Sequence, residues 1–67
     1  MKFTLLFNNK KEEKELLHDD YSINDLLKDL NLSSQTIVAK INNEIVIEET
    51  TIKNTDEVQL IQIIYGG

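Results

Sequence analysis

The sequence predicts an α+β fold in which one helix packs across one face of a mixed sheet of four or five strands. Two patterns support this prediction. Apolar residues recur with helical spacing over residues 23–30, and short apolar runs typical of strands lie on both sides of that segment. The 67 residues suffice for one modest core. We therefore expect a single domain over residues 1–67 that ends in a flexible Gly-Gly tail at residues 65–67.

A hairpin is expected at the N-terminus. Apolar side chains alternate with other residues over positions 2–7, which predicts a strand with one buried face. Residues 8–11 read Asn-Asn-Lys-Lys, and asparagine tolerates the positive φ angles that tight hairpin turns require. The return strand is predicted at residues 12–18, and its charged beginning favours an edge position in the sheet.

A short helix follows the hairpin. The Ser22 hydroxyl can accept a hydrogen bond from the backbone N–H of Asp25, and the Asp25 carboxylate can bond back to Ser22. The next apolar residues share one helical face: they are Ile23, Leu26, Leu27 and Leu30. Asn31 suits the left-handed position just beyond a helix end.

The second half of the chain contains the remaining strands. Residues 37–41 read as a buried strand, Asn42-Asn43 as a turn, and residues 44–47 as a short strand. Residues 48–56 are polar and irregular, with Ile52 as the one apolar anchor.

The longest strand candidate is the last one, residues 57–65, which leads directly into Gly66-Gly67. The resulting order, two strands, a helix, two strands, a loop and a strand, fits the β-grasp architecture. In that architecture the first and last strands lie parallel at the centre of the sheet, and both terminal segments are apolar enough for such a position. A split β-α-β fold uses similar elements in a different order.

Composition excludes several classes of function. The chain has no cysteine, so it has no disulfide, thiolate nucleophile or cysteine-based metal site. Its N-terminal apolar run is too short for a signal peptide, and no run is long enough to cross a bilayer, so we expect a cytoplasmic protein. A net charge of −5 with seven lysines and no arginine disfavours nucleic acid and anionic membrane as partners and favours a basic protein surface.

Three polar clusters are weak candidates for chemistry. His18-Asp19-Asp20 places its groups side by side rather than at metal-ligand spacing, so a solvated loop is the better interpretation. The charge run at residues 10–14 reads as a solvated hairpin. Glu48-Glu49 could act as acid and base, but nothing near them in the sequence indicates a pocket. We expect no catalytic residue and no metal site, and hence no enzyme.

The chemistry is predicted at the C-terminal glycine pair. The only two glycines are Gly66 and Gly67, although glycine normally marks interior turns. Without side chains such a tail can enter a narrow channel, so Gly66 gives access and the Gly67 carboxylate reaches a reaction centre. ATP could activate this carboxylate as an acyl-adenylate, and a sulfur nucleophile could then produce a thiocarboxylate. The alternative interpretation is a frayed end or a cloning scar.

Three segments resemble the ThiS family, the ubiquitin-like sulfur carriers of thiamine biosynthesis. Residues 56–67 are similar to its tail, residues 22–30 to its single helix, and residues 41–46 to its hairpin. The tail is shared with the molybdopterin-synthase small subunit and with ubiquitin-like modifiers, and the short length favours the ThiS branch. Many ThiS proteins have glycine where this chain has Thr55, and a small residue where it has Tyr65.

The resemblance implies a set of partners and a reaction cycle. A ThiF-type enzyme would adenylate Gly67 with ATP and Mg²⁺, so the carrier itself would bind no cofactor. A cysteine desulfurase or another persulfide donor would supply sulfur, and a thiazole synthase would receive it. The alternatives are a molybdopterin-type carrier, a modifier whose Gly67 forms isopeptide bonds, and a β-grasp interaction module without covalent chemistry.

The last strand carries a second signal. In an extended strand, alternate residues share a face; the second face would carry Gln59, Ile61, Ile63 and Tyr65. We expect Ile61, Ile63 and Tyr65 to form a partner-binding patch beside the tail. The competing interpretation is that a bulge or a frayed tail mixes the two faces, or that a loop covers the outer one.

Overall fold

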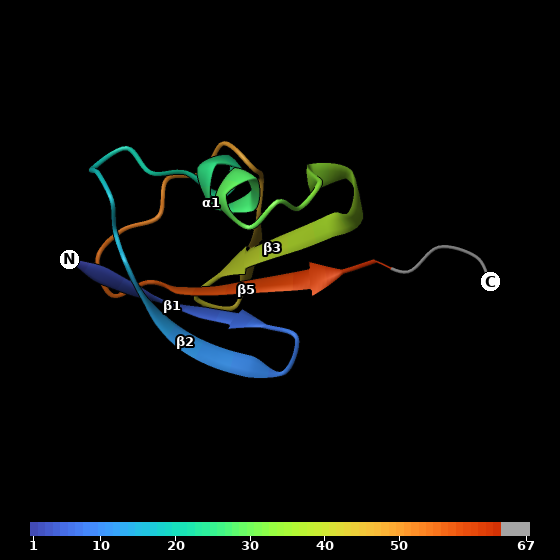
Figure 1. The fold of residues 1–67 in the computed structure, drawn as a ribbon, viewed down its shortest axis with the longest axis horizontal. Helices are drawn as coiled ribbons and strands as arrows, with labels where there is room; N and C mark the ends of the chain where they lie inside the picture. Colours follow the sequence, from blue (N-terminus) through green and yellow to red (C-terminus); the bar gives the residue numbers. More distant parts are fainter. Residues whose placement is uncertain (64–67) are drawn as a thin grey trace.

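The computed structural model describes residues 1–63 as a mixed sheet crossed on one face by a single α-helix, α1, Ile23–Asp29 (Figure 1). Within this range the strands are β1 Lys2–Phe7, β2 Lys10–Glu15, β3 Ile37–Ile41, β4 Glu44–Val46 and β5 Glu57–Gln62. A single 3₁₀ turn, Ser34–Thr36, precedes β3. The α+β prediction is therefore confirmed.

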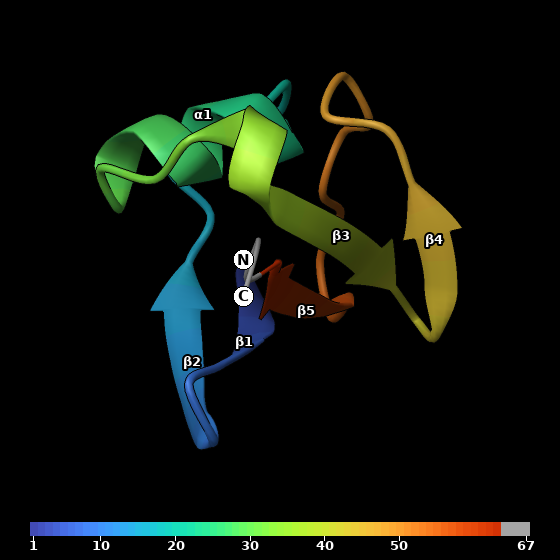
Figure 2. The same cartoon turned by 90° about the vertical axis from the view of Figure 1, so that its right-hand side faces the viewer.

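The strand order is β2-β1-β5-β3-β4. β1 and β5 pair in parallel, and the other neighbours pair antiparallel. Figure 2 shows β2 and β4 at the two edges of the sheet and α1 across one face. The first and last strands are thus neighbours near the centre, as the β-grasp prediction required.

Both hairpins turn on asparagine pairs. Asn8 and Asn9 have φ angles of 54° and 61°, and Asn42 and Asn43 have φ angles of 50° and 73°. Positive φ at both central residues is the property of a type I′ turn, whose twist matches that of the flanking strands. The predicted turns are confirmed, and the first of them needs only Asn8 and Asn9.

Some predicted strand ends were wrong. The return strand of the first hairpin, predicted at residues 12–18, spans Lys10–Glu15. A two-residue turn starts it early, and its pairing with β1 ends where Lys2 faces Glu15, followed by one hydrogen bond from the Leu16 N–H to the Met1 carbonyl at 2.8 Å. The last strand, predicted at residues 57–65, ends at Gln62, which faces the first residue of β3. The prediction for residues 44–47 was one residue too long.

The helix has the predicted start and end. The Asp25 N–H donates to Ser22 Oγ at 3.2 Å, and the Ser22 N–H donates to Asp25 Oδ2 at 3.0 Å, which completes a capping box. At the other end Asn31 has a φ of 60°, and the Leu32 N–H donates to the Leu27 carbonyl at 2.8 Å. This is a Schellman ending, in which a left-handed residue satisfies the last carbonyls.

The core lies between α1 and the sheet. Its buried members come from all three central strands, the helix and two loops: they are Phe3, Leu5, Tyr21, Ile23, Leu26, Leu27, Ile37, Ala39, Ile41, Ile52, Val58 and Leu60. Ile52 is 1% exposed, so the predicted anchor of the 48–56 loop is confirmed. Within residues 1–63, no helix has the length and apolar character needed to cross a membrane.

The Tyr21 hydroxyl has a specific partner at the rim of the core. It donates a hydrogen bond to Asp29 Oδ2. Burial of the ring and this carboxylate raise the pKa of the Tyr21 hydroxyl, burial contributing most. Tyr21 therefore stays neutral and closes the core beneath the end of the helix.

Candidate functional site

The candidate site is the end of β5. Val58 is fully buried and Leu60 is 3% exposed, so β5 is fixed to the core. The Ile63 N–H still donates to the Thr36 carbonyl at 2.8 Å, which holds the backbone one residue beyond the strand. The predicted reacting end, Gly66-Gly67, and the adjacent Tyr65 lie outside the described residues.

Two of the predicted docking residues reach the surface. Val58 and Leu60 point towards the helix, so strand alternation directs Gln59 and Ile61 to the opposite face. Ile61 is 38% exposed, and Ile63 is 37% exposed. The outer face at the end of β5 is thus partly open and apolar at Ile61 and Ile63, and the partner-binding patch stays a prediction.

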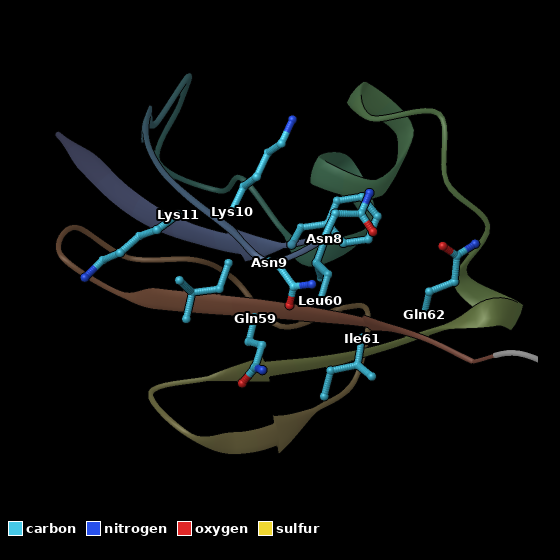
Figure 3. A pocket seen from close by; sticks show the side chains of 10 residues that line it. Asn8, Asn9, Lys10, Lys11, Gln59, Leu60, Ile61 and Gln62 are labelled. Atoms are coloured by element: carbon cyan, nitrogen blue, oxygen red, sulfur yellow. The ribbon is translucent and has the colours of Figure 1, made fainter.

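A groove of about 510 Å³ lies beside this end of β5. It separates β5 from the tip of the β1–β2 hairpin (Figure 3). Its lining residues are Leu6, Phe7, Asn8, Asn9, Lys10, Lys11, Gln59, Leu60, Ile61 and Gln62. Ile61, predicted as a docking residue, therefore also forms one wall of a groove.

The hairpin wall of this groove was not predicted from the sequence. The run at residues 10–14 was interpreted as a solvated hairpin, and Lys10 and Lys11 are indeed exposed. The signal that could have indicated this wall was the predicted strand topology. Parallel pairing of the first and last strands brings the turn after the first strand close to the end of the last.

A second apolar surface was also missed. Ile45 is 72% exposed and Ile47 is 68% exposed, both at the β4 edge. They line a groove of about 470 Å³ between the helix and β3–β4, together with Glu48 and Glu49. This surface lies across β3 from β5.

The polar clusters considered for chemistry lie on the surface. His18 Nδ1 lies 2.5 Å from Asp20 Oδ1, and both side chains are exposed. The His18 ring meets the Tyr21 ring edge-on, with centroids 5.3 Å apart. Within residues 1–63, no group of three or more histidine, cysteine, aspartate or glutamate side chains is placed to hold a metal ion.

The helix-crossed sheet, with its first and last strands parallel and adjacent at the centre, defines a ubiquitin-like β-grasp protein. A family model described as the ThiS family matches residues 4–67. The chain therefore belongs to the ThiS family, whose members are small carrier proteins rather than catalysts.

Solved structures support the same fold. One is the thiamine biosynthesis protein ThiS from Geobacter metallireducens, with a TM-score of 0.70, 22% identity and coverage of 100% of both chains. Another is SAMP1 from Haloferax volcanii, with a TM-score of 0.67, 16% identity and coverage of 98% of this chain and 97% of the other.

Proposed function

We propose that this chain carries sulfur as a thiocarboxylate on Gly67 for formation of the thiazole ring of thiamine. One observation carries the proposal: the ThiS family match extends through residue 67 and so includes the glycine pair that follows the sheet. The β-grasp core supports it by presenting the end of β5 from a rigid strand.

The proposed chemistry uses the carboxylate and no side chain of the carrier. A Gly67 carboxylate oxygen attacks the α-phosphorus of ATP, with Mg²⁺ on the phosphates, and pyrophosphate leaves. The terminal sulfur of a persulfide attacks the acyl carbon, and AMP leaves. A second thiol then cleaves the resulting acyl disulfide, which gives the Gly67 thiocarboxylate and a mixed disulfide.

The catalytic groups would belong to the partners. The sequence contains no cysteine, so it supplies no thiolate for this cycle. A ThiF-type enzyme would bind ATP and activate Gly67, a cysteine desulfurase or another persulfide donor would deliver sulfur, and a thiazole synthase would consume it. Gly66 would give access to the active site, and Ile61, Ile63 and Tyr65 would dock the partners.

Intact mass spectrometry tests the proposal. Untagged protein is incubated with ATP, Mg²⁺, a ThiF-type enzyme and a persulfide donor. Replacement of one oxygen by sulfur adds about 16 Da, nearly the mass of methionine oxidation, so fragmentation must localise the gain. We expect the gain at Gly67, and none in a variant that lacks residues 66–67.

Two results would contradict the proposal. Folded protein that gains no mass with several such enzymes is not a carrier of this type. Bands of higher mass that survive denaturation and thiols would instead indicate a modifier joined through an isopeptide bond.

A further inference from the structure

β5 loses one neighbouring strand before it ends. β1 pairs with residues 57–59, whereas β3 continues to pair as far as Gln62. The chain leaves β1 after Phe7 and turns back at Asn8. In the same register Phe7, the last residue of β1, lies opposite Leu60, so within residues 1–63 the β1 side of β5 has no strand beside Ile61 and Gln62. An open edge of this kind is a template for an added extended segment.

The backbone N–H and C=O groups of Gln62 are directed to the open side of β5. The Ile63 N–H donates to the Thr36 carbonyl, on the β3 side, whereas the Asp56 carbonyl accepts from the Thr4 N–H, on the β1 side. Because successive residues of a strand direct their N–H and C=O groups to opposite sides, those of Gln62 point towards β1. The N–H and C=O groups of Gln62 can therefore bond to an added strand, because β1 does not extend that far.

The charge of this groove is opposite to that of the molecule. The chain has a net charge of −5, yet the charged residues that line the groove are Lys10 and Lys11. Neither takes part in an ion pair within residues 1–63. Figure 3 shows them extending outward from the hairpin, while Gln59 and Ile61 project from the lower side of β5.

We propose that this groove binds an extended acidic segment of the protein that acts on the tail. The segment adds to β5 as a further strand beside Ile61 and Gln62, where the backbone groups of Gln62 pair with it, and its carboxylates meet Lys10 and Lys11. Backbone pairing sets its position, and the charges select an acidic sequence. The identity of the partner rests on the proposed function, but the edge, the groove and the charges do not.

Charge decides between the possible occupants. A second copy of this chain also has a net charge of −5, so the two copies repel each other as they approach. A basic segment would meet two uncompensated lysines. An acidic segment is attracted by Lys10 and Lys11 and can still form strand hydrogen bonds.

Peptide titration followed by NMR tests the proposal. The ¹⁵N-labelled protein is titrated at low salt with a peptide of about seven residues that alternates valine with glutamate. The matched control peptide has glutamine in place of each glutamate. We expect the largest shifts at residues 8–11 and 60–62, and slower hydrogen exchange of the Gln62 amide in the complex.

Two double variants test whether Lys10 and Lys11 are the charges that attract the acidic peptide. The double substitution Lys10→Gln and Lys11→Gln should weaken binding of the acidic peptide about fivefold. The double substitution Lys28→Gln and Lys53→Gln removes the same charge from exposed positions outside the groove and should leave binding unchanged.

Several results would overturn the proposal. It fails if the acidic peptide does not bind, or if the glutamine peptide binds equally well. It also fails if the NMR shifts are confined to the β4 edge, or if the two double variants weaken peptide binding equally. Shifts that grow with protein concentration alone would assign the groove to self-association. The titration needs neither enzyme nor ATP, and the mass measurement needs no peptide, so the two proposals can fail independently.

Discussion

At the scale of single residues, asparagine replaces glycine in this fold. Within residues 1–63, the non-glycine residues with positive φ are Asn8, Asn9, Asn31, Asn42, Asn43 and Thr55. Asparagine visits this region at low cost because its short polar side chain bonds locally. Thr55, at a φ of 71°, is a β-branched exception, and strain is expected there.

Replacement of Thr55 by glycine should stabilise the protein. Its N–H donates to the Lys2 carbonyl at 2.7 Å, which holds the strained backbone in place beside β1. Thr55→Gly should raise the free energy of unfolding by about 1 kcal/mol, because relief of left-handed strain exceeds the entropy cost of glycine.

Urea unfolding measures this change, with Thr51→Gly as the matched control. Thr51 is not among the positive-φ residues, so its substitution should lower stability. Equal or lower stability of Thr55→Gly would show that Thr55 carries no strain.

The capping box makes the free energy of unfolding depend on pH in the acid range. The hydrogen bond from the Ser22 N–H to the Asp25 carboxylate holds the pKa of Asp25 below its ordinary value of 3.8. This stabilisation is present above the ordinary pKa and is lost as the pH falls through the lower, folded-state pKa.

Asp25→Asn should therefore be less stable than the wild type at neutral pH, and the difference should shrink in acid. Measurements of unfolding free energy from neutral pH down to below 3.8 follow it. Ser22→Ala, which removes the other half of the box, should cost about 1 kcal/mol at neutral pH. A constant difference between wild type and Asp25→Asn across the acid range would contradict the assignment.

At the scale of elements, the sequence signals differ in how local they are. The helix was predictable at both ends because its cap and its left-handed Asn31 are encoded within a few residues. β2 was misplaced because Leu16-Leu17 look like strand residues, whereas the length of β1 decides where β2 ends. The groove escaped prediction because its walls, residues 6–11 and 59–62, meet only through the pairing of β1 with β5.

Because strand alternation in β5 places Leu60 in the core and Ile61 on the outer face, substitutions there should affect stability and the proposed docking separately. Ile61→Asp and Ile63→Asp place charge on partly exposed positions, so each should cost less than about 1 kcal/mol of stability. Each should slow the appearance of the thiocarboxylate about tenfold by weakening partner contact. Leu60→Asp buries a charge in the core and should unfold the domain.

Mass spectrometry measures the rate of thiocarboxylate formation, and urea unfolding of the same samples measures the stability. Ile45→Asp is the control, because Ile45 is exposed but lies on β4, separated from β5 by β3. It should leave the rate unchanged. If Ile61→Asp and Ile63→Asp unfold the protein, the partner-binding patch is refuted.

At the scale of the whole molecule, the β1–β5 pairing joins the two ends of the described chain. Thr4 pairs with Glu57, so the central ladder forms only after most of the chain has been brought together. Contacts of such long range slow folding relative to helical domains of similar size. Because small single domains usually fold in one cooperative transition, we expect the core, the helix and β5 to form together.

The parallel direction of β1 and β5 has a practical consequence for attachment. The chain enters β1 at Lys2 and leaves β5 at Gln62, at opposite ends of strands about 20 Å long. An affinity tag or a bead linked before Met1 would stand at the far end of the sheet from Gln62. A protein immobilised in this way would offer the end of β5, the hairpin lysines and whatever follows Ile63 to soluble enzymes without obstruction.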